Sequence, residues 1–209
     1  MLDIQILLAF FGASFLLALA PGPDNIFVLT QSALFGYRAG LATTFGVLTG
    51  VLIHTVAVAC GVAVLFKTSI LAFNILKFLG AAYLCWLAWL AYKSGAQSIN
   101  NKNTAAFTGY GALYMRGVIM NITNPKVLLF FLAFLPQFCI PGSIPMVWQI
   151  LILGFLFVIA AFIVFCPVAI LGGKLEKKFN SSPKMQIWLN RIAGTVFLGL
   201  AGALIFTGQ

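Results

Sequence analysis

Two charged residues directly follow proline motifs inside long apolar stretches of this sequence. Asp24 follows Pro21-Gly22-Pro23, and Lys126 follows Thr123-Asn124-Pro125. Charges at membrane depth are costly, so they are rare and usually serve binding or ion transfer. Proline removes a backbone N–H and clashes with the preceding helical turn, so each motif should break a helix. An acid and a base at two breaks could together bind a molecule that carries both an ammonium and a carboxylate group.

We expect Asp24 and Lys126 to occupy matching positions, each near the start of the helix that follows its break. A helix N-terminus carries unpaired N–H groups and partial positive charge. This suits Asp24, whereas Lys126 needs an anion nearby. We therefore expect Lys126 to bind a carboxylate and Asp24 to bind an ammonium, with the two side chains paired in the empty site. Titration of Asp24 would couple binding to protons.

Three polar neighbours of the breaks, Asn25, Thr123 and Asn124, have two open interpretations. They could satisfy backbone groups that the breaks leave unpaired, or they could contact the bound molecule. Together with the prolines and the glycine of the two motifs, they complete the candidate binding site.

The single histidine, His54, lies on a face of small residues. Ala42, Gly46, Gly50 and His54 recur every four residues, and small residues at this spacing let helices approach closely. We therefore expect His54 to point into the protein rather than into lipid. It could be a hydrogen-bonded packing residue, or it could relay protons or contact substrate.

The four cysteines give no sign of redox or metal chemistry. They are scattered along the chain, without a C-x-x-C motif or metal-ligand spacing. A membrane thiol oxidoreductase of the CcdA/DsbD type would need two thiols able to meet, one beside each break. No cysteine flanks Pro23 or Pro125. We expect packing roles for these residues, and we expect neither a metal, a cofactor nor a catalytic residue.

The composition indicates a protein whose main surroundings are lipid. Of 209 residues, 62% are hydrophobic and only 7% are charged, against about 25% charged residues in soluble domains. The net charge of +9 would suggest nucleic acid in a soluble protein. Here the basic residues cluster in short connectors, which favours a bilayer partner over nucleic acid. The sequence predicts a single transmembrane bundle over residues 1–209.

Six apolar segments predict six transmembrane helices, of which the first and fourth are broken at the proline motifs. The segments are 4–35, 40–66, 70–92, 112–136, 146–172 and 187–207. Three crossings per half is an odd number, so the two halves must enter the membrane from opposite sides. The predicted fold class is therefore an all-α membrane protein built from two inverted three-helix repeats.

The boundaries of these repeats follow from the polar stretch in the middle of the chain. We expect a first repeat over 1–92, a cytoplasmic connector over 93–109 and a second, inverted repeat over 110–209. A basic residue, a glycine, an aromatic residue and a leucine recur with the same spacing in 77–84 and 191–198. This internal similarity supports a duplicated three-helix unit.

The distribution of lysine and arginine predicts the orientation. Seven of these residues lie in the connectors after segments 1, 3 and 5, against one, Lys67, in the connector after segment 2. Positive charge marks cytoplasmic connectors, so both termini should be periplasmic. The apolar run that begins at Ile4 ends in Ala18-Leu19-Ala20 but lacks the basic start of a signal peptide. We therefore take it as the first membrane helix.

These motifs resemble those of the LysE/RhtB family of amino-acid exporters. The matching residues are Ala20–Leu29, Gly36–Leu41, Gly46–Gly50, Thr123–Lys126 and Gln137-Phe138. The resemblance implies a six-helix bacterial inner-membrane protein that exports amino acids in exchange for protons. The single acid at the candidate site favours a neutral substrate of the threonine, homoserine or leucine class over a dibasic one. A passive amino-acid channel remains an alternative, and a homo-oligomer is compatible with this plan.

Overall fold

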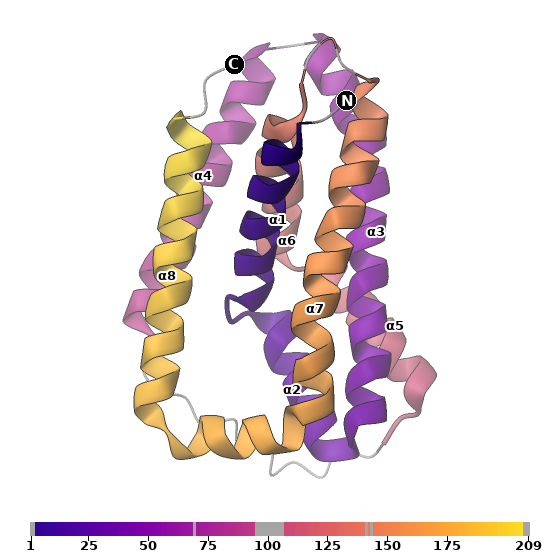
Figure 1. Ribbon diagram of the computed structural model, residues 1–209, viewed down its shortest axis with the longest axis vertical. Helices are drawn as coiled ribbons and strands as arrows, with labels where there is room; N and C mark the ends of the chain where they lie inside the picture. Colours follow the sequence, from indigo (N-terminus) through magenta and orange to yellow (C-terminus); the bar gives the residue numbers. More distant parts are fainter. Residues whose placement is uncertain (1–2, 69, 95–106, 141, 143, 207–209) are drawn as a thin grey trace.

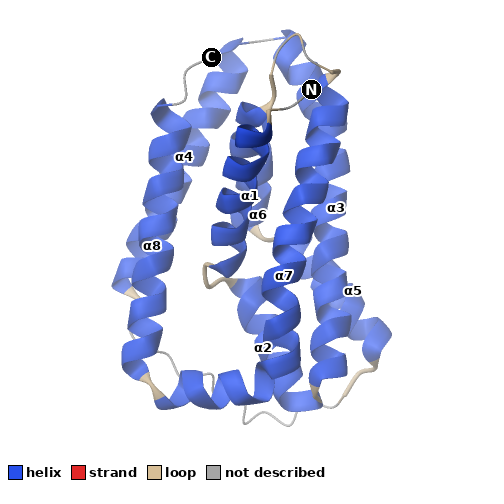
Figure 2. Ribbon diagram, in the orientation of Figure 1, coloured by secondary structure: helices blue, strands red, loops and turns tan. Residues whose placement is uncertain are grey.

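The computed structural model describes residues 3–68, 70–94, 107–140, 142 and 144–206, which are helical apart from short loops (Figures 1 and 2). The connector predicted over 93–109 therefore lies largely outside the described residues. The helices are α1 (Ile4–Leu19), α2 (Pro23–Phe35), α3 (Tyr37–Thr68), α4 (Ile70–Lys93), α5 (Tyr110–Ile122), α6 (Pro125–Leu129), a π-helical turn η1 (Phe130–Phe134), a 3₁₀ turn η2 (Leu135–Phe138), α7 (Met146–Ser181) and α8 (Pro183–Phe206).

Both predicted helix breaks are confirmed. The axes of α1 and α2 meet at 56°, and those of α5 and the segment Pro125–Phe138 meet at 49°. Each second piece begins with a proline at its first helical position, where the missing N–H is not needed for a helical hydrogen bond. The prolines therefore both end one helix and start the next.

The described helices make this a multi-pass membrane protein. Three helical stretches are long and apolar enough to cross a membrane, and counting each bent pair as one span raises the number to five. The three stretches are Tyr37–Gly61, Met146–Gly172 and Pro183–Phe206. The six-span plan also needs α4, whose 24 residues correspond to about 36 Å of helix. The sixth span stays a prediction.

Successive elements run up and down the long axis, so the start of α1 and the end of α8 lie at the same end of the bundle (Figure 1). The predicted apolar segments agree with the helix ends to within a few residues, except in α7. That helix continues beyond the predicted end at residue 172 to Ser181. Its last part runs across the end of the bundle opposite the chain termini (Figure 1).

The small-residue face of α3 packs closely against α5. A Cβ on Gly46 would clash with the backbone carbonyl of Tyr114, and one on Gly50 would lie 2.7 Å from the side chain of Asn121. Glycine at these positions lets the two backbones approach. The small-residue face predicted from the sequence is therefore a helix–helix contact. Gly50, on this face, contacts Asn121 in the last turn of α5, beside the second break.

Glycines at matching positions of the sequence repeat lie at the contact between α4 and α8. A Cβ on Gly80 of α4 would lie 2.6 Å from the side chain of Ala133 in η1 and 3.3 Å from Leu204 of α8, and one on Gly194 of α8 would lie 2.9 Å from the Tyr92 ring of α4. The two glycines are separated by 194 − 80 = 114 residues, which is the offset of the sequence repeat. The residues that they contact are not equivalent, since Leu204 corresponds to Leu90 (204 − 114) and not to Tyr92. The inverted repeat, with its division into 1–92 and 110–209, therefore stays a prediction.

Candidate functional site

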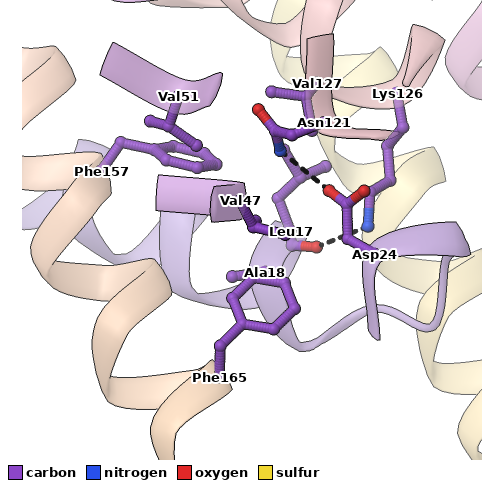
Figure 3. A pocket seen from close by; sticks show the side chains of 10 residues that line it. All are labelled: Leu17, Ala18, Asp24, Val47, Val51, Asn121, Lys126, Val127, Phe157 and Phe165. Carbon is purple, nitrogen blue, oxygen red and sulfur yellow. Dashed lines mark hydrogen bonds between the residues drawn. The ribbon is translucent and has the colours of Figure 1, made fainter. Parts of the chain in front are cut away.

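Asp24 and Lys126 lie at equivalent positions of the two breaks and in the same pocket. Each is the second residue of its helix, directly after the proline that begins α2 or α6. Their side chains are only 2% and 6% exposed. Figure 3 shows the two charged groups on one side of a small cavity. The structure thus brings together an acid and a base that are 102 residues apart in the sequence (126 − 24).

The Lys126 ammonium is held by the end of α1 rather than by its own helix. Nζ donates hydrogen bonds to the carbonyls of Leu17 at 3.2 Å and Ala20 at 3.1 Å. The last carbonyls of a helix lack helical partners and carry partial negative charge. A Cβ on Gly22 would lie 2.9 Å from Nζ, so the glycine of the first motif leaves room for the ammonium. The first break therefore stabilises the lysine at the second.

Asp24 is bound by an amide from α5. Its Oδ2 accepts a hydrogen bond of 2.9 Å from Nδ2 of Asn121, while its Oδ1 is buried and has no hydrogen-bond partner among the described residues. Among the described residues no hydrogen bond joins the side chains of Asp24 and Lys126 (Figure 3), and the predicted closure of the empty site by this pair stays a prediction. The breaks supply nearer partners, namely free carbonyls for the lysine and an amide for the acid.

The three polar neighbours of the breaks all bind backbone groups. Asn25 donates to the carbonyl of Ala18 at 2.8 Å, and the Asn124 side chain accepts from the backbone N–H two residues further along at 3.0 Å. Thr123 donates to the carbonyl four residues earlier at 2.9 Å. The structure thus places all three as caps of the broken helices. Oδ1 of Asn25 and Nδ2 of Asn124 are buried without a partner, which leaves a substrate contact open for these two.

His54 lies inside the protein, as expected, but not on the cavity wall. Its side chain is 5% exposed, and Nε2 lies 3.2 Å from the backbone carbonyl of Asn121. Its ring centroid is 5.8 Å from that of Phe131. His54 therefore ties α3 to the end of α5, as a packing residue would. A part of His54 in proton transfer stays a prediction.

Asn121 is the residue that sequence reasoning missed. It is 1% exposed, lines the cavity and contacts Asp24. The available signal was an amide inside an apolar stretch two residues before the second motif, since such residues usually bind neighbouring helices. The other lining residues besides Asp24 and Lys126 are apolar: Leu17, Ala18, Val47, Val51, Val127, Phe157 and Phe165.

No cysteine lines this cavity. Cys60 and Cys85 are exposed, and Cys139 and Cys166 are partly buried; all four are free thiols. Within the described ranges, no group of three or more histidine, cysteine or acidic residues is placed to bind a metal ion. The polar groups at the two breaks can therefore bind a molecule through charge and hydrogen bonds.

Comparisons with known proteins identify the family. A family profile described as LysE type translocator matches residues 6–208. The chain is 38% identical over 201 residues to a homoserine/homoserine lactone efflux protein of Salmonella typhimurium, covering 96% of each chain. It is 31% identical over 209 residues to an uncharacterized membrane protein of Vibrio cholerae, covering both chains fully. No solved structure matches it. The chain therefore belongs to the LysE family of translocators and is a membrane transporter rather than an enzyme.

Proposed function

We propose that this protein exports small neutral amino acids, of the threonine, homoserine or leucine class, in exchange for protons. The relatives named for efflux of homoserine and its lactone support this substrate class. So does the cavity, where Asp24 is the only acid among the lining residues. A dibasic substrate would need a second carboxylate for its side-chain cation.

The proposal depends on one observation, the burial of opposite charges at two helix breaks in a single cavity. Oδ1 of Asp24 has no partner and can accept from a substrate ammonium. Lys126 uses two of the three N–H donors of its ammonium on carbonyls of α1. The third donor is free for a substrate carboxylate. A zwitterion bound this way neutralises both buried charges, and the apolar lining accommodates an uncharged side chain.

The cavity is small in this conformation. It measures about 10 Å³, close to the smallest volume that holds one water molecule. An amino acid needs a larger space, so the site must widen before substrate binds. A carrier exposes its site to the two sides of the membrane in turn, and such a change of conformation would provide this space.

Proton exchange would act through Asp24. The ionised carboxylate binds the ammonium, and a proton arriving from the periplasm displaces it, so that protonation and substrate binding exclude each other. Export then follows from the proton gradient. We place the protein in the bacterial inner membrane with both termini in the periplasm, in line with the basic connectors and with the start of α1 and the end of α8 lying at the same end of the bundle (Figure 1). A homo-oligomer is compatible with this arrangement.

The proposal is tested in liposomes that contain the purified protein and carry an imposed pH gradient. We expect the wild-type protein to move L-homoserine or L-threonine against its concentration gradient, and L-lysine not at all. Asp24→Asn should fold normally, by circular dichroism and size-exclusion chromatography, yet lose this proton-driven flux. Undiminished proton-driven transport by Asp24→Asn would refute the assignment. Downhill flux alone in the wild-type protein would favour a passive channel.

A further inference from the structure

We infer that Asn121 is a positioning residue that makes the site selective for one enantiomer of its substrate. It holds one oxygen of the Asp24 carboxylate at 2.9 Å and leaves the other, Oδ1, without a partner. The inference rests on the proposed function and adds to it, because it states how a zwitterion would be oriented.

The chemistry of the two groups fixes the orientation of the Asn121 amide. An ionised carboxylate can only accept hydrogen bonds, so the NH₂ group of the amide must face Asp24 and its oxygen must point away. That oxygen lies against Gly50, where an added Cβ would be only 2.7 Å from it. The amide is therefore confined between the Asp24 carboxylate on α2 and the bare backbone of α3.

Helix α3 contacts the backbone of Asn121 as well as its side-chain amide. Nε2 of His54, one turn beyond Gly50 on α3, lies 3.2 Å from the Asn121 carbonyl. Gly50 and His54 thus fix the side chain and the main chain of this residue, so α3 holds the group that orients Asp24. This gives the small-residue face of α3 a function beyond packing.

A fixed carboxylate provides one of three points that define the handedness of a bound amino acid. Oδ1 of Asp24 would bind the ammonium, Lys126 the carboxylate, and the apolar residues the side chain. Three different contacts on one tetrahedral carbon can be satisfied together by only one enantiomer. Without Asn121, the Asp24 carboxylate can rotate about its Cα–Cβ and Cβ–Cγ bonds and follow an ammonium in either position.

The test compares L- and D-homoserine as competitors of labelled L-homoserine exchange in liposomes. Asn121→Leu keeps the approximate size of the side chain but removes the donor. We expect the wild-type protein to prefer the L form and Asn121→Leu to lower that preference about tenfold, as the loss of one hydrogen bond to a charged group predicts. Ser14→Ala is the matched control: among the described residues, Ser14 Oγ and Asn121 Oδ1 are both buried without a hydrogen-bond partner, but Ser14 does not line the cavity.

A residue that merely packs would lower the exchange of both enantiomers equally. An unchanged preference in Asn121→Leu, or a wild-type protein that accepts both forms alike, would overturn the inference. If Asn121→Leu does not fold, Gly50→Ala replaces it, because a methyl group there displaces the same amide; its preference should fall too, and an unchanged preference would again overturn the inference. If the wild-type protein exchanges neither form, the proposed function fails instead.

Discussion

At the scale of the residue, a lysine near the start of a buried helix is in an unfavourable place, because that end carries partial positive charge. Hydrogen bonds from Lys126 Nζ to the carbonyls of Leu17 and Ala20 at the end of α1 offset this unfavourable position. The sequence predicted that Lys126 would need an anionic partner, and it named Asp24 or a substrate. It could not predict backbone carbonyls, because their availability depends on how the end of α1 and the start of α6 lie in the folded chain.

This arrangement predicts that Lys126 stabilises the fold as well as binding substrate. Lys126→Met would leave two buried carbonyls unpaired, at about 1–3 kcal/mol each, and would remove the opposite charge beside Asp24. We expect a clearly lower thermal unfolding midpoint in detergent and no transport. The double variant Asp24→Asn/Lys126→Met should regain part of the stability, because no uncompensated charge remains in the cavity.

The matched control is Lys174→Met, which removes an exposed lysine. Its unfolding midpoint should stay close to that of the wild-type protein, since exposed charges contribute little. If Lys126→Met unfolded at the wild-type temperature, the two hydrogen bonds to α1 would have no energetic importance. Lys126 would then be free to serve substrate alone.

At the scale of the element, the helix breaks could be predicted because the effect of proline is local. In both bent pairs the second helix starts at the predicted proline. Predicting these starts needed no knowledge of contacts between distant residues. Asn121 could not be found in this way. Its role depends on contacts with Asp24 and Gly50, two residues that lie far from it in the sequence, and a single amide in an apolar stretch does not reveal its partner.

The contact between α3 and α5 predicts different effects on stability for two glycine-to-alanine substitutions in α3. Gly46→Ala would drive a methyl group into the Tyr114 carbonyl, whereas Gly61→Ala would meet no atom within 4 Å. Overfilling a packed contact costs about 1–3 kcal/mol, so Gly46→Ala should unfold at a lower temperature and Gly61→Ala should not. Thermal unfolding followed by circular dichroism measures both. Equal midpoints for the two variants would mean that α3 and α5 are not packed closely at Gly46.

At the scale of the whole molecule, composition and hydropathy were enough to predict a helical membrane bundle. Composition and hydropathy could not fix the number of spans. A bent pair can cross the bilayer as one span or form two short elements, and its position in the bilayer decides between the two. Gly80 and Gly194, which match in the sequence repeat, both lie at the contact between α4 and α8. The inverted plan stays a prediction, and the orientation of the helices in the membrane tests it directly.

The inverted plan predicts that the start of α1 and the start of α3 face opposite compartments. In a variant without its four cysteines, Asp3→Cys and Arg38→Cys introduce single thiols at exposed positions near these two helix starts. In this plan α1 and α2 together cross the bacterial inner membrane once, so a membrane-impermeant maleimide should label Asp3→Cys in cells whose inner membrane is intact. It should label Arg38→Cys only after that membrane is permeabilised. Labelling of both from the same side would mean that the bent pair enters and leaves by one face, which would remove the odd number of crossings per half on which the inverted repeat depends.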